Sequence, residues 1–123
     1  MHSEYSVLDG QSKIYEIIER CQKYGMRACA LTDHGALFGA LEFYQAARKA
    51  GIKPIIGSEL YVAKNSRFDK TGRSAGASSN HFLLLCENEV GYRNLCKLSS
   101  LGYTEGFHYK PRVDFELLSK YKE

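Results

Sequence analysis

The stretch Ala28-Cys-Ala-Leu-Thr-Asp-His-Gly35 is the most informative part of this 123-residue chain. Ala28–Leu31 is a short apolar run of the kind that forms a strand buried on both faces. Three polar residues follow at once, and Gly35 then lets the backbone turn into the next segment. A buried strand that ends in polar groups just before a helix is where α/β folds place their functional sites. The stretch therefore predicts an α/β fold with a site at the end of this strand.

Hydrophobic periodicity on both sides of this strand predicts alternating helices and strands. Apolar residues recur at helical spacing after Ser12, the expected N-cap, up to Gly25, the expected C-cap glycine. Further helices are expected over about 36–50, 89–103 and 114–121, and further strands over 53–63 and 82–86. The order strand, helix, strand with short connections is that of a right-handed βαβ unit, which makes the sheet parallel.

The composition is that of an ordinary globular domain and excludes several classes of protein. The chain is 44% hydrophobic and 25% charged, and its net charge of +3 does not by itself indicate nucleic-acid binding. The four cysteines have no CxxC spacing, which favours buried, reduced thiols. No apolar run approaches a membrane span and the N-terminus is polar, so we expect a cytoplasmic protein with no membrane partner.

Five residues are candidates for chemistry because imidazole nitrogens and carboxylates together suit zinc, manganese or iron. They are His2, Asp9, His34, Glu59 and His81. Each also has a structural interpretation, since a histidine near a strand end is commonly a hydrogen-bonding group and Asp-Gly is typical of a turn. From spacing alone, a metal site and a set of structural polar groups both remain open.

Three of the polar residues raise particular questions. Glu59 is hard to explain structurally, because a carboxylate inside an apolar strand is costly unless it is paired or metal-bound. Asp33 either caps the following helix or orients a neighbouring ligand. His81 opens its apolar run, whereas a parallel strand should present ligands at its far end. Either that strand begins earlier, or His81 reaches the site by another route.

The segment 64–80 is rich in Gly, Ser and Ala and carries four cationic residues. Its length without periodicity is typical of a solvated surface loop or of a functional one. The functional alternative is contact with nucleic acid or with a neighbouring domain. Its candidate residues are Lys64, Arg67, Lys70 and Arg73.

Several runs of sequence form a specific set that extends along nearly the whole chain. They are His2-Ser-Glu-Tyr-Ser-Val-Leu-Asp-Gly10, Ala30-Leu-Thr-Asp-His-Gly35, Phe38-Gly-Ala-Leu-Glu-Phe-Tyr44, Gly51-Ile-Lys-Pro-Ile-Ile-Gly57 with Glu59, Asn65-Ser-Arg-Phe-Asp69, His81-Phe-Leu-Leu-Leu85, and Gly91-Tyr-Arg-Asn-Leu95 with Lys97-Leu98. These runs resemble the polymerase and histidinol phosphatase (PHP) domain, in the form found in the alpha subunit of bacterial DNA polymerase III.

The resemblance implies a distorted parallel (β/α)7 barrel with a trinuclear centre of divalent metals, zinc or manganese, at one end. His2 matches the second histidine of the family's HxH pair, and the next four ligands match Asp9, His34, Glu59 and His81. Residues 1–123 would be the N-terminal part of such a domain, roughly its first half. The first strand, with the first histidine of the pair, and the later barrel units with their ligands would be missing.

The resemblance also implies a function. The parent protein would be the catalytic subunit of a replicative DNA polymerase, which binds DNA and deoxynucleoside triphosphates and uses magnesium in a palm domain that is not part of this chain. Its partners would be other holoenzyme subunits, including the proofreading exonuclease and the sliding clamp. The PHP domain itself would act as a metal-dependent phosphoesterase or 3′–5′ exonuclease, and the isolated chain is expected to be inactive. The alternatives are a free-standing phosphoesterase similar to histidinol phosphatase, and a non-catalytic scaffold that binds the proofreading subunit.

Overall fold

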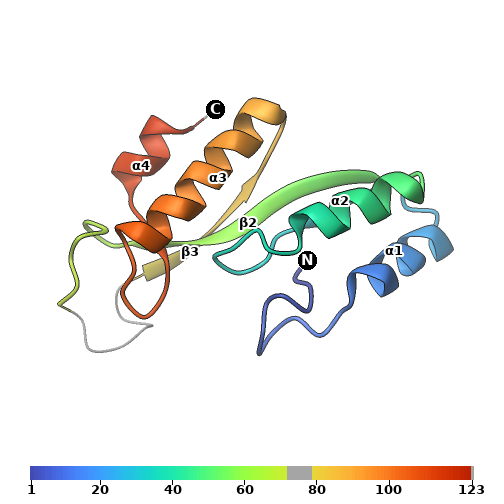
Figure 1. Ribbon diagram of the computed structural model, residues 1–123, viewed down its shortest axis with the longest axis horizontal. Coiled ribbons are helices and arrows are strands. Elements are labelled where there is room, and N and C mark those ends of the chain that lie inside the picture. The colour runs from blue at the N-terminus through green and yellow to red at the C-terminus, as the bar shows by residue number, and fades with distance from the viewer. Residues whose placement is uncertain (72–78, 123) are drawn as a thin grey trace.

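A long central strand, β2 (Lys53–Ala63), organises the fold, and every other strand pairs with it (Figure 1). The structure is a computed structural model that describes residues 1–71 and 79–122. The remaining elements are α1 (Ile14–Lys23), β1 (Ala28–Leu31), α2 (Ala40–Lys49), β3 (Ser79–Leu85), α3 (Glu89–Thr104), β4 (Arg112–Val113) and α4 (Phe115–Lys120). None of the helices in these two ranges is both long enough and apolar enough to cross a membrane.

The two halves of β2 have different neighbours on the same edge. β1 runs parallel to the first half, from Ala28 opposite Lys53 to Leu31 opposite Ile56. β4 runs parallel to the second half, where Arg112 lies opposite Tyr61. β3 covers the other edge of that second half. Between β1 and β4, this edge of β2 is open over its middle residues, and the chain that follows β1 lies beside them.

The expected α/β architecture is confirmed, but the sheet is mixed rather than wholly parallel. β3 pairs antiparallel with β2, from Gly57 opposite Leu85 to Ala63 opposite Ser79. The reason is that no helix lies between these two strands in the described part of the chain, so β3 returns along the strand that precedes it. β3 also begins earlier than the expected 82–86, which places His81 inside the strand.

Three smaller expectations are also corrected. The N-cap of α1 is Lys13 rather than Ser12, and the carboxylate of Glu16 accepts a hydrogen bond from the Lys13 N–H (3.4 Å). α2 begins at Ala40 rather than near residue 36, because the preceding backbone stays bound to β2. In that stretch the Gly35 N–H donates to the Glu59 carbonyl (2.8 Å). β4, with only two residues, was not expected at all.

Helices cover one face of β2 and leave the other face for polar side chains. Leu60 and Val62 point into a core formed with α3, β4 and α4, while a second core lies between α1, β1 and α2. Figure 1 shows α2 beside the half of β2 that pairs with β1, and α3 beside the other half. Because side chains alternate along a strand, Glu59 and Tyr61 project from the opposite face. The candidate site is built on that face.

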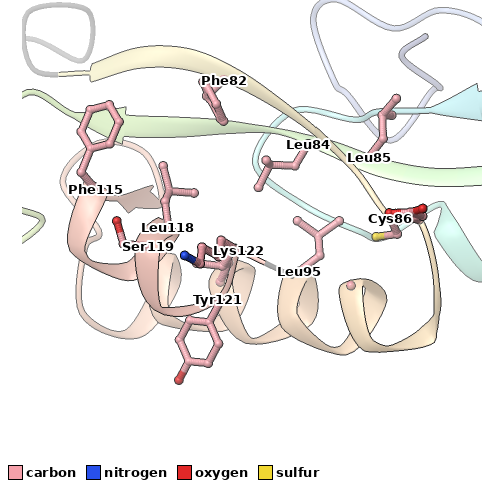
Figure 2. A pocket seen from close by; sticks show the side chains of 13 residues that line it. Phe82, Leu84, Leu85, Cys86, Leu95, Phe115, Leu118, Ser119, Tyr121 and Lys122 are labelled. Atoms are coloured by element: carbon pink, nitrogen blue, oxygen red, sulfur yellow. The ribbon is translucent and has the colours of Figure 1, made fainter.

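An apolar groove of about 420 Å³ lies on the helical side, between β3, α3 and α4. Leu84 of β3, Leu95 of α3 and Leu118 of α4 line it (Figure 2). Its lining includes none of the five candidate ligands. The four cysteines are free, as expected, but only Cys21 is buried, whereas Cys29, Cys86 and Cys96 are partly exposed.

Candidate metal site

The end of β1 and the middle of β2 bring His34 and Glu59 together. The two residues form a parallel bridge that continues the β1–β2 pairing. On one side the Glu59 N–H donates to the Asp33 carbonyl (3.0 Å), and on the other the Gly35 N–H donates to the Glu59 carbonyl (2.8 Å). Gly35 adopts a φ of 61°, the left-handed conformation that glycine tolerates best. The backbone therefore fixes both side chains on one face of the sheet.

The N-terminal segment adds His2 to this pair. The Thr32 N–H donates to the Met1 carbonyl (2.8 Å), which holds the segment against the end of β1. His2 Nδ1 lies 2.7 Å from the Thr32 carbonyl oxygen, and its ring stacks on His34 with centroids 4.0 Å apart. A carbonyl can only accept, so Nδ1 carries the proton and donates. In the neutral ring, Nε2 is then left with a free lone pair.

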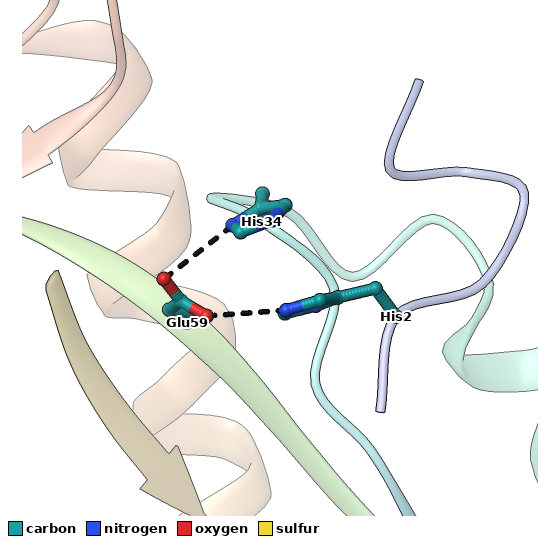
Figure 3. Close-up of side chains that lie close together, drawn as sticks. All are labelled: His2, His34 and Glu59. Carbon is teal, nitrogen blue, oxygen red and sulfur yellow. Dashed lines mark ion pairs between the residues drawn. The ribbon is translucent and has the colours of Figure 1, made fainter. Parts of the chain in front are cut away.

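That lone pair faces a carboxylate, as Figure 3 shows. His2 Nε2 lies 3.3 Å from Glu59 Oε2, and His34 Nδ1 lies 3.5 Å from Glu59 Oε1. The three residues offer ligand atoms that all lie within 4.8 Å of one another. Two acceptors that face each other require either a proton or a cation between them. The arrangement is therefore a potential cation site.

The remaining two candidates border this group. His34 Nε2 contacts Asp9 Oδ2 at 2.5 Å, and this hydrogen bond lowers the pKa of Asp9 below its usual range. His81 Nδ1 contacts Glu59 Oε1, and its ring lies edge-on to that of His34 with centroids 6.1 Å apart. The antiparallel direction of β3 explains how His81 reaches the site from near the start of its strand. All five candidates thus converge around Glu59.

Asp33 holds the N-terminal segment in place and does not cap α2, whose N-cap is Gly39. The Asp33 carboxylate is buried, with 2% of the residue exposed. It accepts hydrogen bonds from the Ser3 N–H (2.6 Å), the Ser3 hydroxyl (2.8 Å) and the Ser6 hydroxyl (2.8 Å). These bonds anchor the chain between His2 and Asp9, so Asp33 acts on the candidate ligands through the backbone.

The donor set suits a divalent cation in two respects. In the described part of the chain, His34 Nδ1 is the buried side-chain polar atom left without a hydrogen-bond partner, and such orphaned groups are rare in folded proteins. His2 donates its other ring N–H to a backbone carbonyl, as metal-ligating histidines commonly do. Nitrogen and carboxylate donors together match zinc or manganese.

The residues that support the cluster carry no local sequence signal. Ser3, Ser6 and Thr32 are small polar residues with no distinctive spacing, and their roles depend on contacts distant in sequence. Tyr61 could have been found, because it follows Glu59 by two residues and so shares its face of the strand. Its ring centroid lies 5.1 Å from that of His81 and 6.4 Å from that of His34.

Arg67, one of the four basic candidates in segment 64–80, takes part in a buried cluster of ion pairs. Arg67 is 8% exposed, and its guanidinium pairs with the carboxylates of Asp114 (3.0 Å) and Glu105 (2.7 Å). The guanidinium is thus occupied by carboxylates of this chain, and Arg67 joins the segment to Asp114 at the start of α4. Lys64 and Lys70 are exposed, and Arg73 lies outside the described residues.

The comparison with known families identifies the class of protein. The chain matches the PHP domain family over residues 1–123, and it belongs to that family. It is 55% identical over 123 residues to the DNA polymerase III subunit alpha of Borreliella burgdorferi. It is also 54% identical over 122 residues to the same subunit of Chlamydia trachomatis and 44% identical over 128 residues to that of Aquifex aeolicus. The chain spans about a tenth of the length of these relatives (10–11%).

Solved structures support the same fold. A protein from Bifidobacterium adolescentis, described as a metal-dependent phosphoesterase, is 20% identical and superposes with a TM-score of 0.54. The match covers 80% of this chain and 30% of that protein. An amidohydrolase from Chromobacterium violaceum is 25% identical, with a TM-score of 0.51 over 81% of this chain and 32% of that protein. The fold of this chain thus corresponds to part of each of those structures.

Proposed function

We propose that the cluster centred on Glu59 binds divalent metal ions and serves the hydrolysis of phosphoesters. The observation that carries this proposal is the convergence of His2, His34 and Glu59, whose ligand atoms lie within 4.8 Å of one another. His2, His34 and Glu59 would be the first ligands, and Asp9 and His81 would complete the set contributed by this chain. Zinc and manganese are the metals that fit these donors best.

The chemistry of the site divides between the bound ion and the side chains. A divalent metal held there would lower the pKa of a bound water and stabilise charge on phosphate oxygens. Glu59 contributes the negative charge that a cation requires, and its two oxygens are aimed at different histidines. Asp9 fixes the His34 ring through its contact with Nε2. Thr32 fixes the ring of His2, and thus the nitrogen that faces Glu59.

We further propose that this chain is the PHP part of a protein of the DNA polymerase III alpha type, covering the N-terminal portion of a barrel. Identities of 44–55% over the whole chain to such subunits support this assignment. The whole protein would then be a cytoplasmic DNA-directed DNA polymerase, with magnesium in a palm domain outside this chain. Its partners would be DNA, deoxynucleoside triphosphates and holoenzyme subunits such as the proofreading exonuclease and the sliding clamp. A 3′–5′ exonuclease role of the PHP domain is the specific form of phosphoesterase activity that fits such a protein.

The test is the variant Glu59→Gln in the full-length protein, assayed with added manganese or zinc on a chromogenic phosphodiester and on the 3′ end of single-stranded DNA. We expect hydrolysis to fall about 100-fold or more, because metal affinity and activity both depend on the carboxylate. Polymerisation by the same protein should change far less. The control is Glu4→Gln, which neutralises an exposed carboxylate on the neighbouring segment. Hydrolysis unaffected by Glu59→Gln would contradict the phosphoesterase proposal and favour a scaffold role for the domain.

A further inference from the structure

An unpaired cation lies next to the metal-site candidates. The ammonium nitrogen of Lys110 is 4.3 Å from the ring centroid of Tyr61. Tyr61 in turn flanks both His34 and His81, at the centroid distances of 6.4 Å and 5.1 Å. Across the residues that the structure describes, no carboxylate lies within 4.0 Å of the Lys110 ammonium. The charge of Lys110 is therefore free for a ligand.

The segment that carries Lys110 is held firmly. The buried guanidinium of Arg112 donates from Nε to the Gly106 carbonyl (3.0 Å), which closes the segment at its base. Within it, the His108 N–H donates to the Lys110 carbonyl (3.1 Å), and Tyr109 adopts a φ of 62°. A tyrosine in the left-handed region is strained, and such residues persist only where the surroundings enforce them. The backbone that carries Lys110 is thus held by contacts within the chain.

The segment that carries Lys110 also packs beside the metal-site candidates. A methyl group built on Gly35 would lie 3.1 Å from the Pro111 ring and 2.9 Å from the Tyr61 ring. The residue after Lys110 therefore packs directly against the residue after His34. Pro111 thus places the segment that carries Lys110 beside the backbone that carries His34. Tyr61, between them, holds the ammonium through a cation–π contact.

We propose that Lys110 binds a non-bridging oxygen of the phosphate group of the substrate, with Tyr61 as its positioning residue. This inference rests on the phosphoesterase function proposed above and names an anionic phosphoester as the ligand of that site. The carboxylates of Asp9 and Glu59 line the cluster and would repel a phosphate unless cations offset them. Bound metal offsets part of this charge, and an unpaired lysine, which binds phosphate as a point charge, supplies a further cation.

The experiment measures the binding of inorganic phosphate, by isothermal titration, to the full-length protein loaded with manganese. We expect Lys110→Gln to weaken phosphate binding about tenfold, the loss typical of one charge-assisted hydrogen bond. Metal content should be unchanged, and Lys110→Arg should restore most of the affinity because it keeps the charge. The KM for a phosphodiester should rise in Lys110→Gln in parallel with the loss of phosphate affinity.

The matched control is Lys97→Gln, because the Lys97 ammonium also lies over a tyrosine ring, that of Tyr121 at 5.6 Å, but away from the metal-site candidates. This variant should bind phosphate like the wild type. Wild-type phosphate affinity in Lys110→Gln, with metal still bound, would overturn the role of Lys110 and leave the proposed metal site standing. A wild-type protein that binds neither metal nor phosphate would overturn both proposals.

Discussion

Replacing Asp33 with alanine should detach the N-terminal segment from the sheet and weaken metal binding without touching a candidate ligand. The buried carboxylate accepts three hydrogen bonds, two from Ser3 and one from Ser6. A hydrogen bond to a charged group contributes about 1.5–3 kcal/mol to stability, and bonds that share one acceptor group are not additive. We therefore expect Asp33→Ala to lower the free energy of unfolding by about 4 kcal/mol, near the lower sum of the three.

The metal affinity should fall as well, because His2 and Asp9 flank the segment that Asp33 anchors. Removing a group that orients metal ligands typically costs about 10–100-fold in affinity. Asp33→Asn separates charge from geometry: one oxygen can still accept from the Ser3 N–H, so we expect a loss of about 1–2 kcal/mol and a smaller effect on the metal.

The assay combines urea denaturation, followed by circular dichroism, with a zinc or manganese titration of each folded variant. Asp69→Asn is the control, because that exposed carboxylate bonds to Thr71, far from the cluster in sequence. Its stability and metal affinity should match the wild type. If Asp33→Ala kept wild-type metal affinity while remaining folded, the N-terminal segment would be held by contacts other than those of Asp33, contrary to this prediction.

Three further predictions concern the ion pair of Asp114, the close packing at Gly10 and the reactivity of Cys29. Burial alone would raise the pKa of Asp114, but hydrogen bonds from Arg67 and the Leu117 N–H outweigh burial, so the pKa lies below its usual value. The ionised carboxylate therefore stabilises the fold above about pH 4, and this contribution is lost as the pH falls further. Asp114→Asn should cost about 3 kcal/mol at pH 7 and flatten the dependence of unfolding free energy on pH between 2 and 5, whereas an unchanged profile would contradict the role of the pair. Gly10→Ala should lower the free energy of unfolding by about 2 kcal/mol and weaken metal binding, since the added carbon would lie 1.8 Å from the Ser3 carbonyl oxygen. Wild-type values in denaturation and metal titration would show that the N-terminal segment can shift without loss of stability or of the site. Burial raises the pKa of the Cys29 thiol to about 11, so alkylation followed by mass spectrometry at pH 8 should label it far more slowly in the folded than in the denatured protein, and equal rates would be inconsistent with its burial.

The strands closest to the site could be predicted from the sequence because their limits are set locally. β1 and β2 have the expected bounds, since each is an apolar run that ends in glycine or polar residues. Asp114 caps α4 as expected, because its carboxylate accepts from the Leu117 N–H (3.1 Å). These features depend on a few neighbouring residues, which is the range over which hydrophobic pattern and capping are informative.

The direction of β3 could not be predicted in the same way. An apolar run indicates a strand but not the direction of its partner, and the expected alternation of helices and strands favoured a parallel one. The antiparallel pairing places His81 opposite Tyr61, two residues from Glu59 on the same face. This pairing removes the difficulty that His81 precedes its apolar run.

The candidate site was only partly accessible to sequence reasoning. His34 and Glu59 could be placed near each other, because they belong to one βαβ unit. The approach of His2 depends on hydrogen bonds between residues about 30 positions apart, such as that between His2 and Thr32, which no local pattern encodes. The burial of Arg67 could not be predicted either, because its partners Glu105 and Asp114 lie about 40 residues away in sequence.

Whether His2, His34 and Glu59 form a metal site is tested by the zinc and manganese affinity of His34→Ala in the full-length protein. His108→Ala is the matched control, because His108 lies outside this group of ligands. We expect stoichiometric metal in the wild type and in His108→Ala, and affinity at least about 100-fold weaker in His34→Ala, since a ligand itself is lost. Wild-type affinity in His34→Ala, or a wild type that binds neither metal, would show that these three residues do not form a metal site.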